Sequence, residues 1–219
     1  MIVLADVLSP DEVARIREGL AAAPFRDGRA TAGAAARRVK DNEQARGDDP
    51  GVRALAGLVR EALKRHPVFT PLVRPARWSS LMFSRYSGGQ QYGLHTDDAG
   101  MLDEHGGTLR TDLSFTLFLQ DPDAYDGGAL LIDGLDGERG FRPGAGSAVV
   151  YQTGLLHRVT PVTRGERLAC VGWIQSAVRR ADQRELLFDL ERVALSLPPG
   201  EARLLLDKSL GNLLRMWGE

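Results

Sequence analysis

Short apolar runs alternate with turns from about residue 78 to residue 176, and this pattern restricts the fold more than any other feature of the chain. Gly, Pro and Asp separate the runs, and no helix-length segment lies between them. We expect strands near 79–86, 112–120, 128–133, 147–151, 155–159 and 167–175. Short strands spaced in this way favour an antiparallel sandwich or jelly roll over a sheet built from βαβ units.

Helices are predicted before this β region. Ser9-Pro10-Asp11-Glu12 has the pattern of a helix start, with Ser9 as the N-cap and Glu12 completing a capping box. A second amphipathic helix is expected at about 52–64. Between them, residues 26–50 are rich in Ala, Arg, Gly and Asp without clear periodicity, which predicts an irregular and mobile stretch.

Helical periodicity returns after Ser176 on both sides of Pro198-Pro199-Gly200, which predicts a helical hairpin. Its apolar stripe could pack on the β core or on a second subunit, and the second arrangement would give a homodimer through the C-terminal helices. We therefore expect a mainly β chain with an N-terminal helical flank at 1–77, a β core at 78–177 and a helical extension at 178–219.

The charge balance excludes some classes of partner. The 28 Lys and Arg against 29 Asp and Glu give a net charge of -1, so no basic field exists to attract nucleic acid or an anionic membrane. The N-terminus lacks the pattern of a secretory signal, and no run of 18 apolar residues occurs, so we expect a cytoplasmic protein. The single cysteine, Cys170, is predicted to be a small buried residue.

An imidazole and a carboxylate stand two residues apart at His95 and Asp97, directly after a predicted strand. In extended backbone, residues i and i+2 project to the same face. Both side chains can therefore bind one metal ion from the same side, with Leu94 and Thr96 turned away. Two ligands make a weak site, so the pattern requires a third ligand from elsewhere.

His157 is the candidate third ligand. A strand over 155–159 would direct His157 inward and Arg158 outward. Such an inward histidine is more often a hydrogen-bonded core residue than a ligand. The chain has only four histidines, however, and His66 and His105 both stand in predicted loops. His95 and His157 are therefore the pair embedded in strands.

Two neutral imidazoles and one carboxylate on one face of an ion suit Fe(II), because further positions stay open for substrate and oxygen. A hydrolytic zinc site could use the same donors. The helical His-Glu-x-x-His pattern of many zinc hydrolases is absent from the chain.

Arg167 distinguishes between these chemistries. The strand after Gly165 alternates so that Arg167 shares one face with Ala169 and Trp173, which would carry a guanidinium into the interior. A buried arginine requires an anion, because an unpaired internal charge costs several kcal/mol. A bound dicarboxylate such as 2-oxoglutarate would supply one, and an internal Asp or Glu is the structural alternative.

The same residues, in order and spacing, resemble the prolyl 4-hydroxylase group of Fe(II)/2-oxoglutarate oxygenases. The matching pattern is Arg85-Tyr86-x-x-Gly89-x-x-Tyr92-x-x-His95-x-Asp97, followed by His157 and Arg167. The segments 111–114, 126–128 and 157–165 and the helical tail are similar to bacterial PKHD-type hydroxylases. The resemblance covers nearly the whole chain.

This resemblance implies a double-stranded β-helix, or jelly roll, with Fe(II) bound by His95, Asp97 and His157. It also implies 2-oxoglutarate bound by Arg167, with Tyr86 and Tyr92 lining the cosubstrate pocket. Ascorbate would then serve to keep the iron ferrous. Some relatives carry a tyrosine where this chain has Phe118, so the hydrogen bonds to the cosubstrate are expected to differ in detail.

The implied reaction consumes O2 and 2-oxoglutarate, hydroxylates a substrate and releases succinate and CO2. A peptide, a protein side chain, including a prolyl residue, or a siderophore-like molecule could be the substrate, and some relatives are associated with bacterial iron acquisition. The segments 26–50 and 98–107 are candidate lids. Two rivals stay open at this point: a zinc-dependent hydrolase and a non-catalytic cupin-like binding module.

Overall fold

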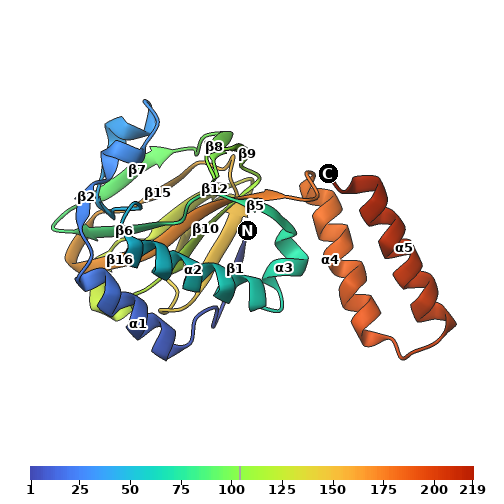
Figure 1. Cartoon of the computed structure of the whole chain (residues 1–219). Helices are drawn as coiled ribbons and strands as arrows, with labels where there is room; N and C mark the ends of the chain where they lie inside the picture. Colours follow the sequence, from blue (N-terminus) through green and yellow to red (C-terminus); the bar gives the residue numbers. More distant parts are fainter. Residues whose placement is uncertain (104) are drawn as a thin grey trace.

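A computed structural model describes residues 1–103 and 105–219 and shows two antiparallel sheets flanked by helices (Figure 1). The larger sheet has the strand order β1-β14-β10-β16-β6-β4-β2, and β5 and β11 also pair with β16. Its strands are β1 (Ile2–Leu4), β2 (Phe25–Asp27), β4 (Glu43–Ala45), β5 (Pro75–Trp78), β6 (Met82–Ser87), β10 (Leu113–Phe118), β11 (Tyr125–Gly127), β14 (Ala148–Gln152) and β16 (Val162–Ser176).

The smaller sheet faces the larger one and has the order β13-β12-β15-β7-β3. Its strands are β3 (Lys40–Asp41), β7 (Gln91–His95), β12 (Leu130–Gly134), β13 (Gly137–Phe141) and β15 (His157–Val159). A separate two-stranded ribbon joins β8 (Gly100–Leu102) to β9 (Thr108–Arg110). Two opposed antiparallel sheets of this kind form a jelly roll, which confirms the predicted fold class.

Helices α1 (Pro10–Ala21), α2 (Pro50–Arg65) and α3 (Phe69–Val73) cover the outer face of the larger sheet (Figure 1). The predicted capping box is confirmed, because Glu12 N–H donates to Ser9 Oγ and Ser9 N–H donates to the Glu12 carboxylate. Fully buried side chains such as Ile16, Leu63 and Phe115 form the core between helices and sheet. Burial of each such side chain contributes about 1.5–3 kcal/mol.

Strand β16 carries the core on one face and the candidate site on the other. Its alternation directs Cys170 and Ile174 into the core beneath the helices, and Cys170 is fully buried as predicted. Arg167 lies on the opposite face, together with Trp173. Both faces of β16 are covered by other parts of the protein. One face packs in the core beneath the helices, and the other lines the space between the two sheets.

The stretch 26–50 departs from its prediction. Instead of being irregular, it contains β2, β3 and β4, together with the 3-10 helices η1 (Gly28–Thr31) and η2 (Ala36–Val39). Lys40 pairs with Tyr92 at the edge of the smaller sheet, and Glu43 pairs with Arg85 at the larger one. Edge strands of two or three residues are too short to produce a visible period in the sequence, so this prediction was wrong.

Other boundaries also moved. The strand expected at 79–86 begins later, at Met82 in β6, and the separate strand β5 precedes it. The strand expected at 155–159 begins at His157, and β16 begins earlier than predicted, at Val162. The expected loop 98–107 includes β8 and leads into β9, and its residue 104 lies outside the described part of the chain.

The predicted C-terminal hairpin is confirmed as α4 (Ala181–Ser196) and α5 (Glu201–Trp217), which project to one side of the sheets (Figure 1). Leu187, Ala194 and Leu210 are buried between the two helices. The end of the chain returns to the β core, where Arg110 Nη1 donates to the Glu219 carboxylate over 2.6 Å. Among the described residues, no helix has the length and apolar character needed to cross a bilayer.

Candidate active site

His95, Asp97 and His157 come together between the sheets. Their ligand atoms all lie within 4.8 Å of one another. Asp97 Oδ1 is 3.8 Å from His95 Nε2, and Asp97 Oδ2 is 3.6 Å from His157 Nε2. The cause is strand pairing, since His157 in β15 stands directly opposite His95 in β7.

Backbone carbonyls fix the orientation of both imidazoles. His95 Nδ1 lies 2.8 Å from the Gly93 carbonyl oxygen, and His157 Nδ1 lies 2.9 Å from that of Leu155. A carbonyl only accepts, so each Nδ1 carries the proton and donates it. In the neutral ring this leaves the lone pair on Nε2, which faces the centre of the triad, and this is the tautomer that metal-binding histidines use.

Burial keeps His95 neutral. Removal from water, and then the nearby His157, lower the pKa of His95 to about 4. The imidazole is therefore uncharged at neutral pH, and its lone pair is available without loss of a proton.

A hydroxyl pair holds the second oxygen of Asp97. Ser114 Oγ lies 2.9 Å from Asp97 Oδ2 and 3.0 Å from Thr153 Oγ1. A carboxylate only accepts, so Ser114 donates its single proton to Asp97 and accepts one from Thr153. This arrangement keeps Asp97 Oδ2 occupied by Ser114.

Tyr92 lies against His95. The two rings stack with centroids 3.6 Å apart, and Lys40 Nζ lies 5.1 Å from the Tyr92 centroid. In a regular strand Tyr92 and His95, three residues apart, would point to opposite faces. A β-bulge in the pairing of β7 with β15 places both on one face. Burial lowers the pKa of Lys40 to about 8, although Asp97 acts in the opposite direction.

Arg167 is buried as the alternation predicted, with 1% of its surface exposed. Its guanidinium carbon lies 5.2 Å from the Tyr86 ring centroid and 5.0 Å from that of Phe118. Nε and Nη2 have no hydrogen-bond partner. Within the described part of the chain no carboxylate pairs with Arg167, so the structural alternative of an internal ion pair finds no support there. A buried guanidinium in this position calls for an anion.

Arg167 opens on the same cavity as two residues of the triad, Asp97 and His157. Its lining includes Asp97, His157, Arg167, Tyr86 and Trp173. Tyr86 stands directly opposite Arg167 across β6 and β16, so it lies at the far end of this cavity from the triad. Tyr92 instead contacts the triad itself through His95.

Sequence reasoning missed several polar residues near the triad and Arg167. Ser114 lines the cavity, and Thr153 contacts Ser114. Lys40 lies beside the Tyr92 ring, and Tyr125 approaches Arg167. Asn42 lies where the chain crosses from the smaller to the larger sheet, is 2% exposed and has an amide without a hydrogen-bond partner. Ser114 belongs to the quoted Thr111–Ser114 motif, which was the only local signal for any of them.

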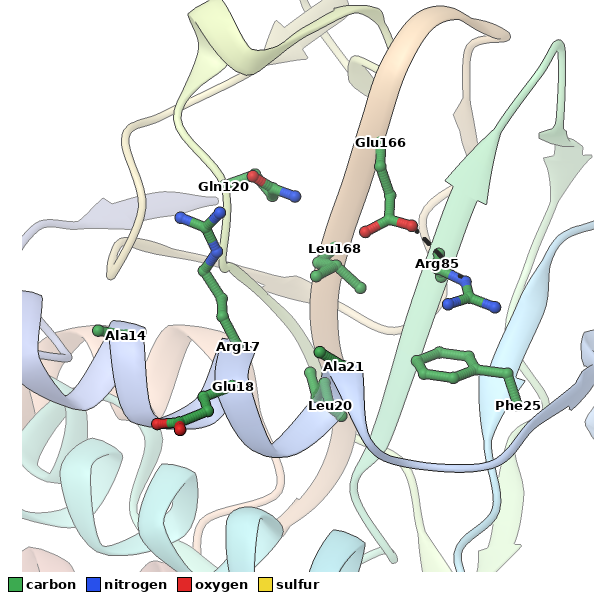
Figure 2. A pocket seen from close by; sticks show the side chains of 10 residues that line it. All are labelled: Ala14, Arg17, Glu18, Leu20, Ala21, Phe25, Arg85, Gln120, Glu166 and Leu168. Atoms are coloured by element: carbon green, nitrogen blue, oxygen red, sulfur yellow. Dashed lines mark ion pairs between the residues drawn. The ribbon is translucent and has the colours of Figure 1, made fainter.

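A second hollow, of about 430 Å³, lies on the other face of β16 beside α1 (Figure 2). Glu166 and Leu168 line it, whereas Arg167 between them points toward the triad. The guanidinium of Arg85 is already paired there with Glu43 and Glu166. The other charged side chains of this hollow, Arg17 and Glu18, are exposed to water, so neither is a buried charge like Arg167.

Comparison with known proteins agrees with this geometry. Residues 81–175 match the 2OG-Fe(II) oxygenase superfamily. The chain is 47% identical to a PKHD-type hydroxylase of Maricaulis maris, with 100% of this chain and 99% of the relative covered. It is 43% identical to a PKHD-type hydroxylase of a Picosynechococcus species, with 99% and 98% covered.

The fold is also similar to that of solved structures. A prolyl-4-hydroxylase of Pseudomonas putida superimposes with a TM-score of 0.53 at 24% identity, over 80% of this chain and 91% of that one. At this identity the likeness concerns the fold alone.

Proposed function

The chain belongs to the PKHD-type hydroxylases, which are 2-oxoglutarate-dependent dioxygenases, and we propose that it hydroxylates a C–H bond of its substrate with release of succinate and CO2. The observation that carries this proposal is the buried guanidinium of Arg167, which pairs with no carboxylate among the described residues and faces the same cavity as Asp97 and His157. When bound, iron supplies the redox chemistry that couples oxidation of 2-oxoglutarate to substrate hydroxylation.

We assign the metal to His95, Asp97 and His157. The donor set fits Fe(II), because it combines two neutral imidazole nitrogens with one carboxylate oxygen on one side of the ion. The hydrogen bonds from Nδ1 of both histidines and from Ser114 orient these donors before the metal arrives. The metal ligands therefore need little rearrangement on binding.

We assign 2-oxoglutarate to the cavity between the triad and Arg167. Arg167 would bind the far carboxylate through its free N–H groups, and Tyr86 would line the pocket beside it. Tyr92 would contribute at the metal end, where it stacks on His95. The walls of this cavity are mostly buried side chains, which keeps water from the reacting atoms.

The proposed substrate is either a peptidyl or prolyl group or a small molecule. The proposal includes a link to bacterial iron homeostasis. Ascorbate would act by keeping the iron ferrous. Residues 28–39 would cover the site from one side, because η2 packs on β7. This packing is close, since a Cβ added at Gly93 would lie 2.8 Å from Val39 Cβ.

Anaerobic titration of Fe(II) and 2-oxoglutarate into the metal-free protein tests this function. A visible charge-transfer band is expected in the wild type, lost in His157→Ala and weakened in Arg167→Ala. His66→Ala and Arg158→Ala are the matched controls, because His66 lies at the end of α2 and Arg158 points outward to Glu138. Absence of the band in folded wild-type protein would contradict the proposal.

Neither rival accounts for Arg167. A zinc hydrolase could use the triad, and a cupin-like binding module could use the jelly roll, but both leave a buried guanidinium without an anion.

We also propose that the hairpin of α4 and α5 forms a homodimer interface. The N-terminal flank (1–77), the β core (78–177) and the C-terminal extension (178–219) are proposed to pack together as one unit. Large apolar side chains are exposed on α4 and α5, including Leu195 at 80%, Leu204 at 70% and Met216 at 72%. Several large apolar side chains exposed on one pair of helices are typical of association sites. Leu204→Lys is expected to lower the mass measured by light scattering from dimer to monomer. A wild-type monomer would contradict this part.

A further inference from the structure

Tyr125 is a fully buried phenol whose hydroxyl makes no hydrogen bond of good geometry within the described part of the chain, although it lies near the guanidinium of Arg167. An unsatisfied buried hydroxyl is unusual in a native protein, because the loss of its bonds to water is not compensated. The ring itself is held firmly: Arg142 lies 4.7 Å from its centroid and donates from Nη2 to the carbonyl of Tyr125. The position of the hydroxyl is therefore fixed by the fold.

The Tyr125 side chain converges with Arg167 at Gly128. A Cβ built at Gly128 would lie 2.9 Å from Arg167 Cδ and 2.9 Å from Tyr125 Cε2. Gly128 thus leaves the space in which the two side chains approach each other. The phenol is near enough to the guanidinium to support its charge, together with Tyr86 and Tyr151.

Three unsatisfied polar groups therefore gather in one place: Arg167 Nε, Arg167 Nη2 and Tyr125 Oη. All three can donate a hydrogen bond, and a carboxylate offers acceptors in two oxygens. We propose that Tyr125 is a binding residue for the far carboxylate of the 2-oxo acid and that, with Arg167, it selects a dicarboxylate over a 2-oxo monocarboxylate. This inference rests on the proposed function and adds a residue to it.

Tyr125 is useful in this position because a phenol can accept from the guanidinium and still donate its own proton onward. Arg167 then attracts the carboxylate by its charge, and Tyr125 donates a hydrogen bond to it from a fixed direction. Phe118, which also faces Arg167, offers no hydroxyl. Tyr125, which approaches Arg167 at Gly128, would add one at this end.

The test is calorimetric titration of the Fe(II)-loaded protein, without oxygen, with two ligands. One is 2-oxoglutarate and the other is 2-oxopentanoate, which has the same chain length and lacks the far carboxylate. The wild type should prefer 2-oxoglutarate by on the order of a thousandfold. Tyr125→Phe should weaken 2-oxoglutarate about tenfold or more and leave 2-oxopentanoate within about twofold, because only the first ligand loses a hydrogen bond to a charged group.

Gly128→Ala provides a second variant should Tyr125→Phe fold poorly. Its methyl group would separate Arg167 from Tyr125, so the same selective loss of 2-oxoglutarate affinity is expected. Gly88→Ala is the matched control, since Gly88 has a similar φ of +56° against +60° at Gly128 and no atom within 4 Å of the added carbon. Both variants carry similar backbone strain, and only Gly128→Ala crowds the pair.

The outcomes separate the two proposals. If the wild type fails to bind 2-oxoglutarate at all, the proposed function itself is wrong. If the wild type binds and prefers 2-oxoglutarate, but Tyr125→Phe and Gly128→Ala keep the full preference, only the assignment of Tyr125 is overturned. An equal loss for both ligands also overturns it, because that pattern indicates a general disturbance of the pocket.

Discussion

Replacing Ser114 with alanine is expected to weaken Fe(II) binding at the triad. Ser114 Oγ donates to Asp97 Oδ2 over 2.9 Å, and the Asp97 side chain is only 8% exposed, so water cannot readily replace the lost donor. A hydrogen bond to a charged acceptor contributes about 1.5–3 kcal/mol. This corresponds to a loss of about 10- to 150-fold in affinity, which agrees with the typical effect of removing the partner of a metal ligand.

The assay is competition for Fe(II), under nitrogen, between the metal-free protein and a chromophoric chelator. Thr153→Val should cause a smaller loss, because Thr153 acts on Asp97 only through Ser114. Ser80→Ala, at an exposed position, is the control for the loss of a hydroxyl. Unchanged affinity in Ser114→Ala, within about twofold, would refute the conclusion that this hydroxyl holds the ligand.

Three further predictions concern buried charge. Arg167→Met should abolish the thermal stabilisation by 2-oxoglutarate yet raise the unfolding free energy of the ligand-free protein by about 1 kcal/mol or more, because it removes a buried unpaired cation; a loss of ligand-free stability in urea denaturation would count against this. The pKa of His95 is lowered to about 4. Between pH 6.5 and 4, His95 is therefore protonated in the unfolded chain but neutral in the folded protein. Stability of the metal-free protein should therefore fall as the pH is lowered through this range, by up to about 1.4 kcal/mol per pH unit, and the fall should be shallower in His95→Gln. The pKa of Lys40 is lowered to about 8, so the folded protein releases its proton before the unfolded chain does. Urea denaturation should show stability rising from pH 8 to about pH 9.5 in the wild type, and an equal rise in Lys40→Met would contradict this origin.

Local periodicity was enough to predict the main elements of the site. His95 and Asp97 were paired because alternate residues of an extended segment share a face, and Arg167 was placed inside by the same rule. The jelly roll followed from short strands without intervening helices, and the first helix followed from its capping box. Each of these features depends on neighbours a few residues apart, which the sequence displays directly.

The stretch 26–50 shows where such reasoning stopped. Its strands β3 and β4 exist because they pair with the edges of two different sheets, and nothing within the stretch itself indicates that pairing. Lys40 and Asn42 therefore entered the site from a segment that local pattern had predicted to be irregular. Edge strands of this length are stabilised by their partners and not by their own propensity.

The sequence by itself determined which residues are candidates for the chemistry, because residue type and alternation bring out the proposed ligands and the buried arginine. Only the tertiary structure decided what surrounds them: the bulge that stacks Tyr92 on His95, the hydroxyl of Ser114 on Asp97, and the approach of Tyr125 to Arg167 at Gly128. These contacts join residues far apart in the chain. They depend on strand register and close packing, which are properties of the whole fold and leave no period in the sequence.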